Sequence, residues 1–167
     1  MIDGYGRTID YVRISVTDRC NLRCVYCMPE EGVGSISHEE ILRFGEIERV
    51  CQILAENGIQ KIKLTGGEPL VRRRLPELAA ALKRIPGIKS LTITTNGVLL
   101  EEMYDALADA GVDSVTISLD TLDASVYRQL TRRDEIEAVR RGLRTAIQKG
   151  RMQIKINCVP VLGIEEQ

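Results

Sequence analysis

Apolar and polar residues follow two different periods along this chain, and the two periods take turns. Five short segments alternate apolar and polar residues or are dominated by β-branched residues, which is typical of β-strands. These predicted strands span residues 11–17, 61–65, 90–95, 114–119 and 153–161. The segments between them repeat apolar residues every three or four positions, which is the period of an amphipathic helix. Helices are therefore predicted at about residues 37–56, 76–85, 100–110 and 135–149.

The first predicted helix carries signals at both of its ends. Ser37, with Glu40 three residues later, has the spacing of a capping box and predicts that the helix opens there. Asn57 and Gly58 form a typical stop signal after the last apolar position.

The alternation of strands and helices predicts right-handed βαβ units and a parallel sheet. Five strands can form either an open doubly wound sheet or part of a (β/α) barrel, and periodicity alone does not choose between them. In both architectures ligands bind at the carboxyl ends of the strands. Uncommon residues gather at these ends, in the segments 20–27, 66–69, 94–97 and 118–120. The sequence therefore predicts one functional site at this edge of the sheet.

The composition fits one ordinary globular domain. The chain has 167 residues, of which 44% are hydrophobic and 28% are charged. Its 23 Lys and Arg against 24 Asp and Glu give a net charge of −1, which argues against general electrostatic binding of DNA, RNA or anionic lipid. No stretch reaches the roughly 20 apolar residues of a membrane span, and the charged N-terminal residues leave no apolar region for a signal peptide. We therefore expect a cytoplasmic protein with no membrane or nucleic-acid partner.

The cysteines are the most informative residues in the composition. Cys20, Cys24 and Cys27 lie within eight residues, whereas Cys51 and Cys158 stand alone. In a reducing compartment such a cluster indicates metal binding or catalysis, and thiolates favour zinc, Cu(I) or iron–sulfur clusters. Cys51 and Cys158 are interpreted as buried core residues of a helix and a strand.

Two occupants of the cysteine cluster remain open on the residues alone. A zinc site needs a fourth ligand, such as His38 or another cysteine. A four-iron cluster held by three thiolates leaves one iron without a protein ligand, where a substrate or cofactor can coordinate.

The cysteine spacing resembles that of a known family. Cys20-x3-Cys24-x2-Cys27, with Tyr26 before the last cysteine, resembles the radical S-adenosylmethionine (SAM) enzymes, and Gly66-Gly67-Glu68-Pro69 after the next strand supports this. Further segments resemble the GTP 3′,8-cyclases of molybdenum-cofactor biosynthesis. They are residues 5–7, 10–21, 26–29, 64–72, 94–97, 118–120 and 155–157.

The resemblance implies a fold and a reaction. The fold is an incomplete (β/α) barrel of parallel strands with about five βα units. The cofactors are SAM and a 4Fe-4S cluster that cleaves SAM reductively to methionine and a 5′-deoxyadenosyl radical. The substrate is GTP, which the family converts to (8S)-3′,8-cyclo-7,8-dihydroguanosine 5′-triphosphate in molybdopterin biosynthesis. The reaction needs an electron donor, whose identity the sequence does not give.

The resemblance also assigns residues. The set comprises Cys20, Cys24 and Cys27 as cluster ligands, Tyr26, Gly66, Gly67, Glu68 and Ser118 at SAM, and Arg13, Lys63, Thr94 and Lys155 at GTP. Cations suit a triphosphate, and a hydroxyl suits a ribose or phosphate oxygen. Without the resemblance, the favoured interpretation of Arg13 and Lys63 is surface charges at strand ends, and that of Thr94 is an ordinary β-branched strand residue. No residue is assigned as a catalytic acid or base.

The resemblance does not extend to the second half of the family's proteins. Those enzymes continue through a sixth strand into a C-terminal region with three more cysteines, which bind a second 4Fe-4S cluster, and only nine residues follow Cys158 here. We therefore expect residues 1–167 to be a partial barrel domain, truncated before the sixth strand, that works with a C-terminal half or as a homodimer. The alternatives are a radical SAM domain of a peptide-modifying family and a zinc-stabilised, non-catalytic binding domain.

Two arginine clusters have open interpretations. Residues 72–74 either reach an anionic ligand near the Gly-Gly segment or form a solvated turn. The arginines between 132 and 144 are expected on a solvated helix face.

Overall fold

The computed structural model describes residues 2–32, 34, 37 and 40–161 of the chain. Its centre is one sheet of five parallel strands, and their order across the sheet is their order along the chain. The strands are β1 (Tyr11–Ser15), β2 (Lys61–Thr65), β3 (Ser90–Thr95), β4 (Ser114–Ser118) and β5 (Gln153–Asn157).

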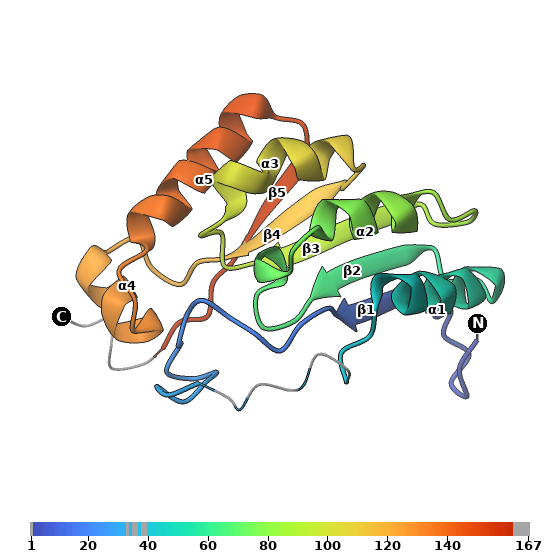
Figure 1. Ribbon diagram of the computed structural model, residues 1–167, viewed down its shortest axis with the longest axis horizontal. Coiled ribbons are helices and arrows are strands. Elements are labelled where there is room, and N and C mark those ends of the chain that lie inside the picture. The colour runs from blue at the N-terminus through green and yellow to red at the C-terminus, as the bar shows by residue number, and fades with distance from the viewer. Residues whose placement is uncertain (1, 33, 35–36, 38–39, 162–167) are drawn as a thin grey trace.

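The helices follow the strands in the predicted alternation. The crossovers contain α1 (Phe44–Glu56), α2 (Leu75–Lys83), α3 (Leu100–Asp109) and α5 (Ile136–Lys149), and two short elements, η1 (Pro69–Val71) and α4 (Ala124–Thr131), were not predicted. Right-handed crossovers between strands in unbroken order place every crossover helix on the same face. Figure 1 shows α1, α2, α3 and α5 on one side of the sheet. The order never reverses, so the predicted partial (β/α) barrel is confirmed and the doubly wound alternative is excluded.

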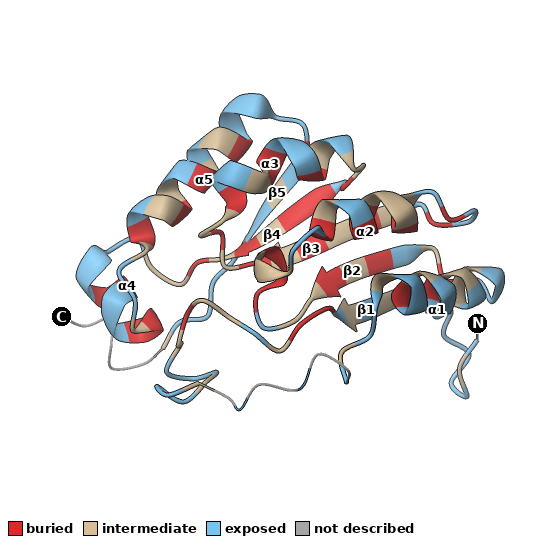
Figure 2. Cartoon of the chain, in the orientation of Figure 1, coloured by how far each residue is buried: buried red, intermediate tan, exposed pale blue. Residues whose placement is uncertain are grey.

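One face of the sheet is apolar and covered by the helices. Its buried side chains are Ile62, Leu64, Leu91, Ile93, Val115 and Ile117. Helix residues such as Leu78, Leu82, Leu100 and Leu107 pack in the same cluster. Burying each of these side chains stabilises the fold by about 1.5–3 kcal/mol. Figure 2 shows the buried residues concentrated along the middle strands, while β5 is largely exposed.

The opposite face is polar because strand residues alternate between the two faces. In the register of the strands, Arg13 lies beside Lys63, and Thr116 lies between Thr94 and Lys155. None of the five described strands contains an acidic residue.

Strand ends follow from pairing. β2 and β3 have the predicted bounds, but β1 and β5 end before residues 17 and 161. A strand continues only while its neighbouring strand continues beside it. The last pair of β1 and β2 is Ser15 with Thr65, after which Gly66 adopts φ +152°. The last pair of β4 and β5 is Ser118 with Asn157.

The prediction that the first helix opens at Ser37 is wrong. Ser37 donates its hydroxyl to Glu40 at 3.0 Å, but this pair lies in the segment before α1. α1 begins at Phe44, where Glu46 accepts the backbone N–H of Arg43 at 2.6 Å. Two pairs with the spacing of a capping box occur here, Ser37 with Glu40 and Arg43 with Glu46, and only the pair next to the packed apolar face starts a helix.

The missed helix α4 had a visible start signal. The Asp123 carboxylate accepts the N–H groups of Ser125 and Val126 at 2.8 and 2.9 Å, which is N-terminal capping. Val126 and Leu130 are spaced for one apolar face and are buried. Within the described residues, no helix has the length and apolar character to span a membrane.

Candidate functional site

The carboxyl ends of the strands meet at one pocket of about 210 Å³, which we call the cysteine pocket. Nine of the twelve residues predicted for the site line it: Cys20, Cys24, Cys27, Tyr26, Gly66, Gly67, Glu68, Thr94 and Ser118. They come from the loops after β1 and β2 and from the ends of β3 and β4. The parallel sheet therefore joins segments that lie far apart in the sequence.

The three clustered thiols lie near one another in this pocket. Cys20 and Cys24 are half-buried and Cys27 is exposed. The pKa of Cys24 is raised to about 11, first by burial and then by the negative charge that Cys20 and Cys27 carry as thiolates. Cys24 is therefore a neutral thiol at neutral pH, and binding a metal ion would remove this proton.

The cysteine loop is anchored on the last turn of α4. The N–H groups of Arg23 and Val25 donate to the carbonyls of Thr131 and Leu130, both at 2.9 Å. These carbonyls belong to the helix end, where no intrahelical donor is available. α4 therefore supports the loop that carries the cysteines.

Arg132 adds a side-chain contact to the same anchor. Its guanidinium donates to the carbonyls of Arg23 and Met28, each at 3.2 Å. The expectation that Arg132 lies on a solvated helix face is therefore wrong. Its backbone adopts φ +53°, which ends α4 and directs the chain back past the loop.

Gly66 and Gly67 fix the contact between the loops after β1 and β2. A Cβ at Gly66 would lie 2.4 Å from the Thr17 carbonyl oxygen, and a Cβ at Gly67 would lie 2.3 Å from that of Arg19. The Gly67 N–H donates to the Thr17 oxygen at 2.7 Å. Only glycine permits this approach, so both residues position the start of the cysteine loop.

Glu68 links the ends of β2 and β3. Its side chain is almost fully buried and accepts hydrogen bonds from the Thr95 hydroxyl and the Asn96 N–H, both at 2.7 Å, and from the Leu70 N–H at 2.9 Å. Burial raises the pKa of this carboxyl, and the three donors oppose the shift. Both carboxylate oxygens have protein donors, so a direct contact between Glu68 and SAM stays a prediction.

Asn96 is a site residue that sequence reasoning did not assign. Its side-chain amide donates to the Asn21 side-chain oxygen at 2.7 Å and lies 3.9 Å from the Cys20 sulfur. The contact ties the end of β3 to the cysteine loop. The Asn-Gly pair after a predicted strand was the available signal, but turn formation explains it equally well.

Asp120 is a second unassigned residue that joins three segments. Its carboxylate accepts a hydrogen bond from the Tyr26 phenol, and its other oxygen accepts the Val159 N–H at 2.9 Å. The pKa of Tyr26 is raised, first by burial and then by this bond to Asp120.

The two isolated cysteines differ in burial. Cys158 donates to the Asp120 carbonyl at 3.3 Å and is exposed, so its predicted core position is wrong. Cys51 is buried, so its predicted core position is confirmed. Cys158 lies beyond the last paired residue of β5, where the described elements provide no cover.

The four residues predicted for GTP share the polar face of the sheet. Arg13 and Lys63 are register neighbours on β1 and β2, and Thr94 and Lys155 lie on either side of Thr116. Thr94 also lines the cysteine pocket, whereas Arg13, Lys63 and Lys155 lie elsewhere on this face. Arg13 and Lys155 are exposed and Lys63 is half-buried, so all three side chains are accessible to a ligand.

The zinc alternative finds no support in the side-chain geometry. In the part of the chain that the structure describes, no three His, Cys, Asp or Glu side chains form a group that could hold one metal ion. His38, the suggested fourth zinc ligand, lies outside the described residues. An iron–sulfur cluster takes its thiolates on different iron atoms, so thiols spread around a pocket suit it better than they suit a single ion.

Comparison with known families decides the membership of the chain. The radical SAM superfamily matches residues 14–167. The chain belongs to the radical SAM superfamily. The resemblance on which the site assignments were based is thereby confirmed, including the likeness to GTP 3′,8-cyclases.

The sequence of this chain is similar to those of curated GTP 3′,8-cyclases over nearly its whole length. The GTP 3′,8-cyclase of Pelotomaculum thermopropionicum is 52% identical over 166 residues, which cover 99% of this chain and 51% of that protein. The GTP 3′,8-cyclase of Petrotoga mobilis is 48% identical over the same shares. The chain spans about half the length of the curated relatives it matches.

Solved radical SAM structures share the fold. Native anSMEcpe with bound AdoMet matches with a TM-score of 0.69 at 21% identity, covering 89% of this chain and 43% of that chain. Streptococcus suis SuiB bound to S-adenosylmethionine matches with a TM-score of 0.69 at 22% identity, covering 89% of this chain and 32% of that chain.

Membership in the superfamily implies SAM and a 4Fe-4S cluster, and the residues that line the cysteine pocket fit both. Three thiols, the chemically preferred ligands of such a cluster, line it together. The Gly66 and Gly67 backbone lies in the same pocket beside them, where no side chain limits the approach of a cofactor.

Proposed function

We propose that this chain is the SAM-cleaving part of a GTP 3′,8-cyclase. In this proposal, the full enzyme converts GTP to (8S)-3′,8-cyclo-7,8-dihydroguanosine 5′-triphosphate. The reaction belongs to molybdenum-cofactor biosynthesis and takes place in the cytoplasm. Identities of 43–52% to curated cyclases over 99% of the chain support it. Because the chain spans about half of those relatives, the proposal assigns the second 4Fe-4S cluster to a C-terminal half or a partner chain.

On the SAM side, each chain residue has a defined task. Cys20, Cys24 and Cys27 hold the cluster, which when bound supplies the electron that cleaves SAM to methionine and a 5′-deoxyadenosyl radical. Tyr26 and Ser118 line the SAM site with Gly66, Gly67 and Glu68. Asn96, Asp120 and α4 keep the cysteine loop in place through the hydrogen bonds described above.

The observation that carries the GTP assignment is that Arg13 and Lys63 lie directly beside each other on β1 and β2. Adjacent strands lie about 4.8 Å apart, and like charges directly opposite each other destabilise a sheet. Lys61, on the same face, has a carboxylate partner in Asp10 at 2.8 Å. No ion pair joins Arg13 or Lys63 to a described carboxylate. An anionic ligand that binds both side chains relieves this repulsion, and a triphosphate has the required charge.

SAM cleavage is tested with the chain itself. Anaerobic reconstitution with iron and sulfide, reduction with dithionite and addition of SAM should give 5′-deoxyadenosine. Cys24→Ala should abolish the product, whereas the matched variant Cys158→Ala should retain it. Iron-loaded wild-type protein that forms no 5′-deoxyadenosine would overturn the assignment for this chain.

GTP binding is tested with two lysines of the same strand and face. Lys63→Met should weaken GTP binding about tenfold or more, since a charge-assisted hydrogen bond contributes about 1.5–3 kcal/mol. Lys61→Met should leave GTP binding near the wild-type value because Lys61 is already paired with Asp10. Calorimetric titration measures both, with 5′-deoxyadenosine formation as the check on the SAM site. Intact SAM cleavage without GTP binding would favour another radical SAM family, such as a peptide-modifying one.

A further inference from the structure

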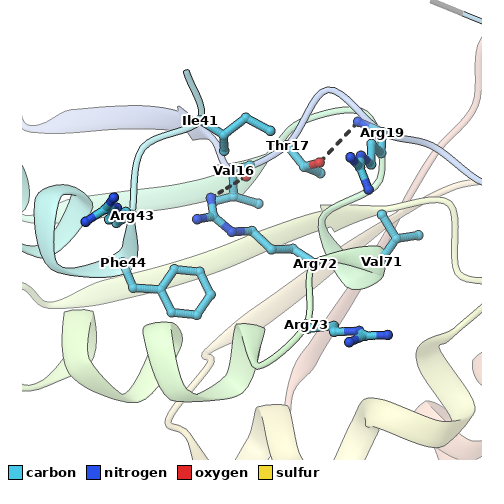
Figure 3. A pocket seen from close by; sticks show the side chains of 9 residues that line it. All are labelled: Val16, Thr17, Arg19, Ile41, Arg43, Phe44, Val71, Arg72 and Arg73. Carbon is cyan, nitrogen blue, oxygen red and sulfur yellow. Dashed lines mark hydrogen bonds between the residues drawn. The ribbon is translucent and has the colours of Figure 1, made fainter. Parts of the chain in front are cut away.

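A second pocket, of about 320 Å³, lies outside the sheet at the ends of β1 and η1 and the start of α1. Figure 3 shows the nine side chains that line it, and four of them are arginines: Arg19, Arg43, Arg72 and Arg73. None of the nine is acidic. We call it the arginine pocket.

Arg72 connects the segments that line the arginine pocket. Its guanidinium donates to the backbone carbonyls of Val16 and Leu42, the latter at 2.6 Å, and lies 4.5 Å from the centre of the Phe44 ring. Arg72 therefore holds the segment before α1 against the end of β1. The remaining arginines are exposed at the rim, and the neighbouring Leu42 side chain is 52% exposed.

The exposed arginines of the chain fall into two groups. Some pair with carboxylates, as in Arg74–Glu77, Arg140–Glu137, Arg141–Glu101 and Arg151–Asp109, whereas others, such as Arg84 and Arg144, have no ion pair with a described residue. Among the described residues, no ion pair involves Arg43 or Arg73. A smaller pocket that shares Val16, Thr17, Ile41 and Arg72 with the arginine pocket is also lined by Asp18 and Glu40, so acidic side chains border the basic surface there.

The arginine pocket and the cysteine pocket are lined by neighbouring residues of the chain. Its lining includes Thr17 and Arg19, and the next residue, Cys20, lines the cysteine pocket. The segments after β1 and after β2 therefore contribute residues to both pockets. A partner bound at the arginine pocket lies next to the backbone that carries the first cluster ligand.

The proposed function creates a need for such a partner, and this inference rests on that function. Cleaving the C5′–S bond of SAM consumes one electron per molecule and yields methionine and the 5′-deoxyadenosyl radical. The electron comes from an external one-electron carrier, which is oxidised by one electron in the same event.

We propose that the arginine pocket is the docking surface of a small acidic electron-carrier protein. Carboxylates of the carrier pair with Arg43 and Arg73, and an apolar side chain of the carrier packs against Ile41 and Phe44. Four arginines with no acid among them match an acidic surface, and arginines around an aromatic floor are typical of protein–protein interfaces. Exposed rim charges act mainly on the association rate.

The test compares a protein donor with a chemical one in the reconstituted chain. The variant is Arg43→Gln/Arg73→Gln, and the matched control is Arg84→Gln/Arg144→Gln, which removes two exposed arginines from α2 and α5. The donors are a reduced flavodoxin with a strongly acidic surface and dithionite. The readout is the initial rate of 5′-deoxyadenosine formation at increasing donor concentration.

The expected result separates the two donors. The Arg43/Arg73 variant should lose about tenfold in kcat/KM for flavodoxin at low salt, a loss that shrinks near 0.5 M salt. Its dithionite-driven rate should match the wild type, and the control should match with both donors.

Two results would overturn the docking surface. One is an unchanged kcat/KM for flavodoxin in the variant, and the other is an equal loss with dithionite, which would assign the arginines a structural role. Absence of product from iron-loaded wild-type protein with dithionite would instead overturn the proposed function, and the need for a carrier with it.

Discussion

The two faces of the sheet are built from the same strands but serve different purposes. The face under the helices is apolar and closely packed, from Ile62 on β2 to Ile117 on β4. The open face and the strand ends carry cations, hydroxyls and thiols, held by individual hydrogen bonds such as that between Asn96 and Asn21. The covered face therefore contributes most of the folding stability, and residues of the open face can serve binding and chemistry without a large loss of stability.

The sharpest test of this division uses two neighbours on β4. Ile117 is fully buried on the covered face, and Thr116 lies on the open face. Ile117→Ala should lower the free energy of unfolding by about 2–5 kcal/mol, because it leaves a cavity. Thr116→Ala should lower it by less than about 1 kcal/mol. Urea denaturation followed by circular dichroism measures both, and equal losses would contradict the division.

Gly67→Ala tests whether the strand ends are as tolerant as the open face. The new Cβ would lie 2.3 Å from the Arg19 oxygen, so the loops after β1 and β2 must separate. We expect a loss of about 1–3 kcal/mol in unfolding free energy and a reduced iron content after reconstitution.

Gly45→Ala is its matched control. Nothing lies within 4 Å of a Cβ at Gly45, which is in α1. Replacing a helical glycine should stabilise the chain by about 0.5–1 kcal/mol and leave the iron content unchanged. Unimpaired iron loading in Gly67→Ala would show that the close approach is not needed to hold the cysteine loop.

Cys51 gives the covered side a pH dependence. Burial raises the pKa of its thiol to about 11, above the usual value of 9.0. The unfolded chain therefore loses this proton first, so the contribution of the neutral thiol is complete below pH 9 and is lost as the pH rises from about 9 to about 11. Between pH 8 and pH 10 the loss should be about 1 kcal/mol.

Cys51→Val isolates this contribution, since the other cysteines titrate equally in both proteins. Urea unfolding at the two pH values should show a steeper decline in the wild type than in the variant. Parallel declines would mean that Cys51 ionises freely in the folded chain.

The smallest expected effect concerns the bond between Tyr26 and Asp120. Both groups are partly exposed, so Tyr26→Phe should cost less than about 1 kcal/mol of unfolding free energy. A double-mutant cycle with Asp120→Asn should give a coupling energy of similar size. No coupling would remove this contact from the set that joins the cysteine loop to the segment after β5.

Sequence reasoning succeeded where local pattern and chemistry coincide. The bounds of β2 and β3, the alternation of elements and the gathering of Cys20, Gly66 and Ser118 at one edge all follow from patterning and from the rule for parallel sheets. It failed where a distant contact decides. α1 starts at Phe44 rather than at Ser37, and the half-buried Arg132 side chain donates to carbonyls of the cysteine loop.

The sequence by itself determined the alternation of strands and helices and the edge of the sheet where the candidate site residues gather, because both follow from the period of apolar residues along the chain and from the rule for parallel sheets. The tertiary structure decided the rest. The Gly67 contact with Arg19, the Glu68 link between β2 and β3 and the arginine pocket each join segments that are tens of residues apart. Such contacts depend on register and packing in three dimensions, and no pattern along the chain records them.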